Sequence, residues 1–259
     1  MNAITAAANP LGCSAEEWST RVDLAAAYRM QARYRLTDMA DGYIAARVPG
    51  EPDAMLLRGY GDFPEIVRAS RLYKRSLSRR PAVEKLDGPD YAAITMTQAI
   101  LNARADLACV IHAHTKATMV IAGLQSAILP VSQAGIMFSG DRAVYLDFCY
   151  NVEEPEHCAQ LAEVLVAPCK VIVLRNHGVI VCGSTVAEAI KLLYYFDQAC
   201  ALQVEMLKTG APLALLEGPR VDEWRRLYWE DTSTVEMNGT REWRSILELL
   251  DRDEPDYRT

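Results

Sequence analysis

Three of the four histidines in the chain lie in two short segments, and their type and spacing suit them for metal chemistry. His112 and His114 follow an apolar run over residues 107–111, and His177 follows another over 171–174. Both runs are typical of buried β-strands. Side chains alternate between the two faces of a strand, so a His-x-His sequence places both imidazoles on one face. We expect a second strand to bring His177 to the same place.

Three imidazoles of this kind form a ligand set for one divalent metal ion, for which manganese, zinc, cobalt and iron are the candidates. Three protein ligands leave coordination positions open for water or substrate, which is typical of catalytic rather than structural sites. A His-x-His sequence alone is a weak signal, and the alternative interpretation is that backbone carbonyls satisfy these histidines.

Composition limits the class of protein. The chain has 259 residues, of which 51% are hydrophobic and 24% charged, and we predict a flexible arm over residues 1–13 and one globular domain over 14–259. A net charge of −7 argues against nucleic acid or an anionic membrane as a partner. The sequence contains no long apolar run or signal peptide, and its seven cysteines form no C-x-x-C motif. We therefore expect a cytoplasmic protein with reduced cysteines.

Helical and strand patterns alternate along the chain. Capping boxes begin at Ser14 and Thr185, each with a glutamate three residues later. Residues 60–90 show the least regular pattern. The periodicity predicts helices over 14–34, 89–104, 116–123, 155–166, 185–208, 222–230 and 241–250, and strands over 42–50, 54–58, 107–114, 127–131, 143–147, 170–174 and 179–182. This order predicts an α/β domain with helices on both faces of a sheet.

Longer motifs around the histidines resemble those of a known protein family. Residues 108–115 read Ala-Cys-Val-Ile-His-Ala-His-Thr, and residues 174–178 read Leu-Arg-Asn-His-Gly. With residues 44–50 and the closing segment 250–257, they resemble the class II aldolase/adducin family, in particular its adducin-like bacterial branch. The resemblance implies that His112, His114 and His177 bind a catalytic metal. It also implies a three-layer α/β/α fold with a mixed, largely antiparallel sheet, assembled as a homotetramer with active sites at subunit boundaries.

Two departures from the family pattern bear on the reaction. Aldolases of the family carry Ser-Ser-Glu, with the acid/base glutamate nineteen residues before the first metal histidine, and here those positions are Tyr91, Ala92 and Ala93. Alanine cannot transfer a proton. The phosphate-binding Gly-Asn-x-Ser segment reads Gly-Tyr-Ile-Ala over 42–45, without the Asn or the hydroxyl. These losses argue against a sugar phosphate as substrate.

The residues near the presumed pocket suit another ligand. Arg58, Tyr43 and Tyr60 are the predicted substrate-binding residues, because a guanidinium pairs with a carboxylate and tyrosines stack on a flat ring. The predicted proton donors are Tyr91 and Tyr228, with Tyr228 reaching the site from a neighbouring subunit. Each of these residues also has a purely structural interpretation, as a tyrosine packed at a sheet edge or an arginine in an ion pair.

Four functions follow from these observations. The first is a metal-dependent carbon–carbon lyase that decarboxylates a hydroxylated aromatic or heteroaromatic carboxylic acid. The second is a non-haem iron oxygenase acting on a hydroxyphenyl acid in secondary metabolism. The third is an aldolase, dehydratase or epimerase on a small sugar-like substrate, and the fourth is a non-enzymatic scaffold like adducin. We rank the decarboxylase first, because breaking its carbon–carbon bond requires no strong base.

Overall fold

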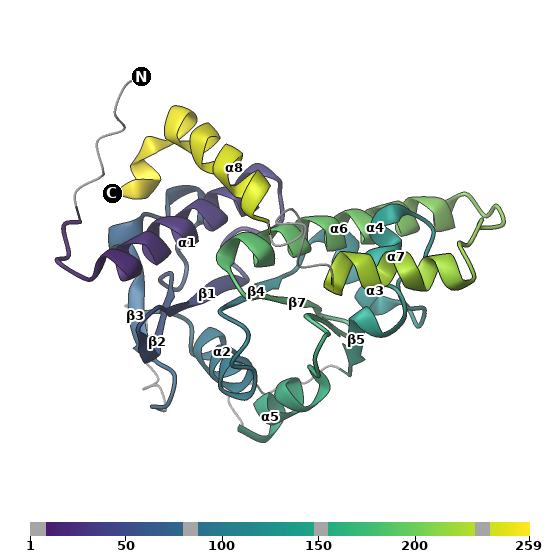
Figure 1. Cartoon of the computed structure of the whole chain (residues 1–259), viewed down its shortest axis with the longest axis horizontal. Helices are drawn as coiled ribbons and strands as arrows, with labels where there is room; N and C mark the ends of the chain where they lie inside the picture. The colour runs from purple at the N-terminus through teal and green to yellow at the C-terminus, as the bar shows by residue number, and fades with distance from the viewer. Residues whose placement is uncertain (1–8, 80–87, 148–154, 231–238) are drawn as a thin grey trace.

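The sheet at the centre of the molecule has seven strands in the order β3-β2-β1-β4-β7-β6-β5 (Figure 1). The computed structural model describes residues 9–79, 88–147, 155–230 and 239–259. Every neighbouring pair of strands is antiparallel except β5 and β6, which confirms a mixed, largely antiparallel sheet. The strands are β1 Tyr43–Val48, β2 Glu51–Leu57, β3 Tyr73–Ser76, β4 Cys109–Ala113, β5 Ala143–Leu146, β6 Val171–Leu174 and β7 Gly178–Gly183.

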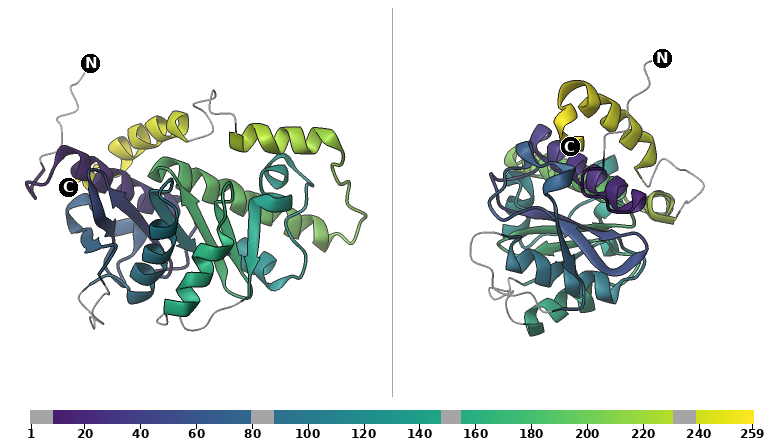
Figure 2. Two further views of the ribbon diagram at one scale, coloured as in Figure 1. Left: turned by 60° about the horizontal axis from the view of Figure 1, so that its bottom comes forward. Right: turned by 90° about the vertical axis from the view of Figure 1, so that its left-hand side faces the viewer.

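Helices cover both faces of this sheet and confirm the α/β/α architecture (Figures 1 and 2). One face packs against α1 (Ala15–Arg33), α3 (Lys116–Gly123) and α6 (Val186–Lys208), and the other against α2 (Tyr91–Ala103) and α5 (Pro155–Val164). Farther from the sheet, α7 (Pro219–Glu230) packs on α4 (Gln133–Phe138), and α8 (Thr240–Asp253) packs on α1 and α6. Short 3₁₀ helices complete the elements at Pro64–Ile66, Ala69–Arg71, Gly140–Arg142 and Pro255–Arg258.

Because both faces are covered, the central strands are buried on both sides and their sequences are continuously apolar. Alternate residues serve two separate cores. Ile111 belongs to the core beneath α1 and α6, whereas its neighbour Val110 belongs to the core beneath α2 and α5. His112 faces the α2 side, since it pairs across the sheet with Tyr43 of β1 and Ile180 of β7.

The predicted helix starts are confirmed in detail. The Ser14 hydroxyl accepts a hydrogen bond from the Glu17 N–H at 3.0 Å, and the Thr185 hydroxyl accepts one from the Glu188 N–H at the same distance. A third cap occurs at Thr115, whose hydroxyl accepts from the Thr118 N–H at 3.2 Å. Helix α3 therefore begins directly after the second histidine, which limits where His114 can lie.

The predicted strand over 127–131 is wrong. This segment lies between α3 and α4 without strand pairing, because side chains bond its backbone: the Ile128 N–H donates to the Tyr145 hydroxyl at 2.7 Å, and the Leu129 N–H to the Gln203 side-chain oxygen at 2.8 Å. Periodicity also missed α4 and the edge strand β3. In β3, the Lys74 ammonium pairs with the carboxylates of Glu17 and Glu51.

Two other expectations concern the N-terminal arm and membrane-spanning helices. Residues 1–8 lie outside the described residues, so the N-terminal arm stays a prediction. Within the described parts of the chain, none of the helices combines the length and apolarity needed to cross a bilayer.

Candidate metal centre

Central strand β4 positions the first two histidines. It lies between β1 and β7, and two residues after its end the chain enters α3. The His112 ring is buried, while His114 follows the end of the strand and keeps 15% of its side-chain surface exposed. Gly42 is required beside this strand, because it adopts φ +74° and a Cβ there would lie 2.5 Å from the His112 carbonyl oxygen.

The tight turn between β6 and β7 supplies His177. Asn176 adopts the left-handed conformation with φ +58°, which asparagine tolerates better than most residues. The His177 N–H donates to the Leu174 carbonyl at 3.1 Å and closes the turn. A Cβ at Gly178 would lie 2.6 Å from both the Ala113 carbonyl oxygen and the His114 ring. Glycine at this position therefore allows the turn to approach β4.

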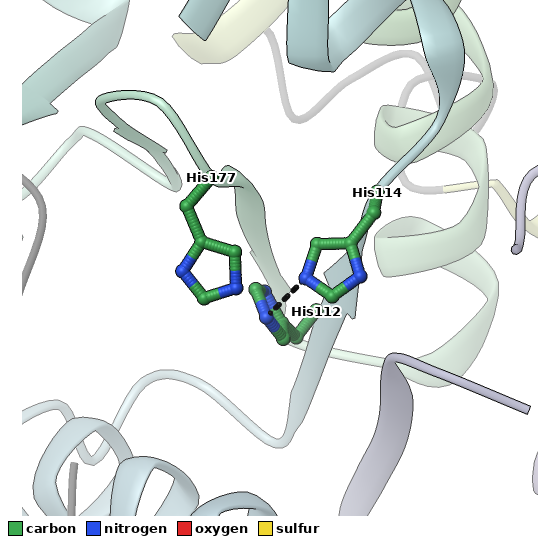
Figure 3. Close-up of side chains that lie close together, drawn as sticks. All are labelled: His112, His114 and His177. Atoms are coloured by element: carbon green, nitrogen blue, oxygen red, sulfur yellow. Dashed lines mark hydrogen bonds between the residues drawn. The ribbon is translucent and has the colours of Figure 1, made fainter. Parts of the chain in front are cut away.

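The three imidazoles face one another (Figure 3). The Nε2 atoms of His112 and His114 are 2.8 Å apart, and the His177 ring centroid is 4.9 Å from that of His112 and 4.8 Å from that of His114. One nitrogen from each ring lies within 4.8 Å of the others. This arrangement brings together all three predicted ligands from two distant segments of the chain.

The other ring nitrogens show that the cluster fits a metal ion. The Nδ1 atom of His112 lies 3.1 Å from the Val179 carbonyl oxygen, and that of His114 lies 3.4 Å from Oδ1 of Asp38. An acceptor at Nδ1 favours the tautomer with its proton there, which leaves the Nε2 lone pair free to bind a metal. Both rings therefore turn a metal-binding nitrogen towards the cluster.

Lowered pKa values keep histidines of the cluster neutral and able to bind a cation. Burial lowers the pKa of His112 well below its usual value, and His114 and His177 lower it further. Burial, followed by the influence of His114, lowers the pKa of His177 to about 4. These two imidazoles are neutral at pH 7, the protonation state that metal binding requires. The three histidines can therefore hold one divalent metal ion.

The predicted substrate-binding residues meet at a small cavity. Tyr43, Arg58 and Tyr60 line a cavity of about 30 Å³ together with Ala93, the alanine that stands in place of the family glutamate. The Tyr43 ring centroid lies 5.8 Å from that of His112, so the cavity adjoins the histidine cluster. A cavity of this size is large enough to admit a water molecule or one small polar group of a ligand.

The polar groups around this cavity differ in their hydrogen bonds and in their exposure. Arg58 is 5% exposed, and its terminal nitrogens donate to the carbonyls of Ala40, Gly42 and Asp62. Its Nε has no hydrogen-bond partner among the described residues. The buried Tyr43 hydroxyl lies near the Thr97 hydroxyl but outside good hydrogen-bond geometry, and burial raises its pKa. Tyr60 is 63% exposed.

The two predicted proton donors occupy different places. Tyr91 is the first residue of α2, half-buried, and is not among the residues that line the cavity. Tyr228 lies in α7, where its hydroxyl accepts a hydrogen bond from Gln133 and its ring packs against the core on the α6 side of the sheet. His112 faces the opposite side, so Tyr228 of the same chain does not join the histidine cluster.

Sequence reasoning missed two carboxylates. Asp38 contacts His114 from an irregular loop, and nothing in its sequence context indicates this contact. Asp90 is the N-cap of α2, where its Oδ1 accepts from the Ala92 N–H at 3.1 Å, and it lines the small cavity. An aspartate directly before a helical pattern is a recognisable signal of a cap. The fourth histidine, His157, is half-buried in α5 and lies outside the cluster.

Comparison with known proteins places this geometry in a family. The sequence model described as Class II Aldolase and Adducin N-terminal domain matches residues 22–204. A Pseudomonas aeruginosa protein, provisionally named an aldolase class 2 protein, is 32% identical over 248 residues, covering 95% of this chain and 94% of that protein. Human beta-adducin is 31% identical over 256 residues, which cover 94% of this chain but 35% of adducin.

Solved structures agree. The crystal structure of an aldolase II superfamily protein from Pseudomonas syringae superposes with a TM-score of 0.86 at 30% identity, covering 96% of this chain and 98% of that one. An L-fuculose 1-phosphate aldolase from Glaciozyma antarctica shares the fold, with a TM-score of 0.77 at 18% identity over 95% and 94% of the two chains. The chain belongs to the class II aldolase/adducin family.

Proposed function

We propose that this protein is a metal-dependent carbon–carbon lyase that decarboxylates a hydroxylated aromatic or heteroaromatic carboxylic acid. One observation carries the proposal: an intact three-histidine cluster stands beside a cavity in which Ala93 replaces the aldolase glutamate. The ligand set supports metal-assisted chemistry, whereas the alanine removes the base that conventional aldol cleavage uses.

His112, His114 and His177 would hold one manganese, zinc, cobalt or iron ion. When bound, that ion supplies Lewis-acid stabilisation to the hydroxyl and carboxylate of the substrate. In this proposal, the exposed Tyr60 provides aromatic surface for the ring, and Tyr43 lines the adjoining small cavity. The Tyr43 hydroxyl and the Arg58 Nε remain able to donate to an oxygen of the substrate, since both lack hydrogen-bond partners among the described residues.

Loss of carbon dioxide leaves an electron pair on the ring carbon, and a proton must replace the departing carboxyl group. We propose Asp90 as the donor, because it lines the cavity beside Ala93 and burial raises the pKa of its carboxyl group despite the opposing effects of the α2 N–H groups and Arg58. Solvent would return the proton. Tyr91, and Tyr228 of a neighbouring subunit, are the alternative donors.

Three other functions have support from specific observations. A relative named as an aldolase favours an aldolase, dehydratase or epimerase acting on a small sugar-like substrate. A set of three neutral nitrogen ligands also suits an iron oxygenase acting on a hydroxyphenyl acid. The match to human beta-adducin favours a scaffold. Bound iron would favour the oxygenase and absence of metal the scaffold, whereas carbon dioxide release from an aromatic acid distinguishes the decarboxylase from the aldolase.

The proposal includes a cytoplasmic homo-oligomer, a tetramer by family resemblance. Exposed apolar side chains on α3 and α6 surround a groove of about 550 Å³ and support contact between subunits; they include Val120, Leu207 and, nearby, Met119 and Leu202. None of the described cysteines forms a disulfide bond, as expected in a reducing compartment. Light scattering coupled to gel filtration measures the subunit number.

The first experiment is elemental analysis of protein purified without added metal, compared with the His112→Ala variant. About one equivalent of manganese, zinc or cobalt, lost in the variant, supports the lyase. Metal-loaded protein is then incubated with ortho-hydroxylated aromatic acids such as 2,3-dihydroxybenzoate, and carbon dioxide release is measured. Iron at one equivalent would put the oxygenase first. If the protein contains no metal and takes up none when metal is added, the non-enzymatic scaffold would be the remaining function.

A further inference from the structure

The loop between α1 and β1, residues 34–42, has an unusual backbone. Arg35 and Met39 adopt φ values of +55° and +57°, and Gly42 ends the loop at +74°. Among the described residues, one other non-glycine residue has positive φ, and it is Asn176, directly before His177. Such conformations cost free energy and cluster at functional sites. Here they occur in the two segments that flank the histidine cluster.

The loop directs a carboxylate at the back of one metal ligand. Oδ1 of Asp38 lies 3.4 Å from Nδ1 of His114, while Nε2 of the same ring faces His112. The two ring nitrogens thus have different partners, one outside the cluster and one inside. The contact joins residues 76 positions apart in the sequence.

The loop is held from both ends, so this contact does not depend on an unsupported surface chain. Leu36 is buried, and its N–H donates to the Gln31 carbonyl at 2.8 Å. At the other end, the buried Arg58 guanidinium donates to the carbonyls of Ala40 and Gly42. Between these anchors, the Asp41 N–H donates to the Asp38 carbonyl at 3.2 Å and closes a turn.

We propose that Asp38 is a positioning residue of the metal centre. Its carboxylate accepts the Nδ1 proton of His114, fixes the tautomer that presents Nε2 to the metal, and makes the imidazole a stronger ligand. Arg58 supports this role by bracing the loop. The inference rests on metal binding by the three histidines, which is part of the proposed function.

The rings of His112 and His114 are oriented by different groups, which explains why a side chain is needed at His114. The His112 ring is oriented by the Val179 carbonyl of the neighbouring strand, which the sheet holds in place. His114 lies beyond the last residue of β4, and the partner of its Nδ1 is the Asp38 carboxylate rather than a backbone carbonyl. Asp38 therefore does for His114 what the backbone does for His112.

Metal affinity tests the proposal without a substrate. Chelator competition with Zn²⁺ and Mn²⁺ would compare the wild type, Asp38→Asn and Asp38→Glu, with Asp41→Asn as control, since Asp41 lies in the same loop and loses the same charge. Loss of such a partner weakens metal binding by about 10- to 100-fold. We expect an effect in that range for Asp38→Asn, partial recovery in Asp38→Glu, and less than a twofold change in the control.

Two further readouts exclude a merely structural effect. Thermal unfolding of the metal-free proteins should be the same for the wild type and Asp38→Asn, because the side chain is 43% exposed. Nitrogen NMR of the Zn²⁺-loaded protein should show a slowly exchanging Nδ1 proton on His114 in the wild type and faster exchange of that proton in Asp38→Asn.

The outcomes separate this inference from the proposed function. If the wild type binds metal tightly and Asp38→Asn binds it equally well, the role of Asp38 is refuted while the metal centre stands. Equal weakening by Asp41→Asn would also refute it, because loop charge alone would then be the cause. If the wild type binds no metal, both the proposed function and this inference fail.

Discussion

The histidine cluster and the neighbouring cavity are built in different ways. Strand pairing and a closed turn hold the histidines, with His112 placed between two hydrogen-bonded neighbours in the sheet. The cavity is lined largely by the loop before β1, the residues after β2 and the start of α2. The sheet therefore preserves the ligand set, whereas replacing single residues at loops and helix ends can change the reaction.

The largest effect should come from disturbing the approach of the β6–β7 turn to β4. In Gly178→Ala, the new Cβ would lie 2.6 Å from the Ala113 carbonyl oxygen, and backbone oxygen cannot move aside easily. We expect a loss of about 1–3 kcal/mol in the free energy of unfolding, as overpacking costs, together with loss of metal binding. Denaturant unfolding and metal titration measure both quantities.

Gly210→Ala is the matched control for this variant. Gly210 adopts φ +66° at the end of α6 with open space around it, so alanine there costs about 1–2 kcal/mol through the backbone alone. Metal affinity should not change. Unaltered metal binding in Gly178→Ala would show that the close approach of the turn is not needed for the cluster.

The pH dependence of stability should report on the buried histidines. Unfolded histidine binds a proton near pH 6.5, but His177 resists protonation until about pH 4, because burial lowers its pKa. The unfolded state therefore binds more protons between these values, and stability falls as the pH is lowered from about 6.5 to 4. Urea unfolding of the metal-free protein at several pH values would measure this loss.

His177→Gln tests that contribution, because it removes the titrating ring; it also removes the lowering effect of His177 on the pKa of His112. Its stability should fall less steeply over the same pH range. An identical slope in the wild type and the variant would contradict a lowered pKa for His177.

Two substitutions at Asp90 separate its cap from its proposed proton transfer. Asparagine caps helices as well as aspartate does, so Asp90→Asn should leave stability unchanged, whereas Asp90→Ala should cost about 1 kcal/mol. Both should reduce turnover of the substrate by about 100-fold, the lower range for general acid catalysis. Turnover that follows stability across the two variants would assign Asp90 a structural role and favour Tyr91 or Tyr228.

The smallest effect concerns a region remote from the chemistry. In Tyr145→Phe, the Ile128 N–H loses its acceptor, which should cost about 1 kcal/mol or slightly more, while the ring remains to pack against the Arg175 guanidinium. Metal affinity should be unaffected. A change in metal binding would show that this segment is coupled to the His177 turn.

Local patterns predicted the elements that have a strong period or a clear cap. The central strands and the helices beginning at Ser14 and Thr185 were recognisable because burial on both faces and capping leave their mark in neighbouring residues. The segment 127–131 was misassigned because it is as apolar as a strand. Its backbone is satisfied by Tyr145 and Gln203, and such distant partners leave no local pattern.

The sequence by itself determined the three histidines and the apolar strands beside them, which are a matter of residue type and short-range spacing. Its resemblance to the family identified Ala93 at the position of the aldolase glutamate. Only the tertiary structure decided that Asp38 lies behind His114, that Asp90 shares the cavity with Ala93, and that the Arg58 guanidinium donates to two carbonyls of the loop before β1. Those relations join irregular segments far apart in the chain, where chain folding rather than any periodicity brings the side chains together.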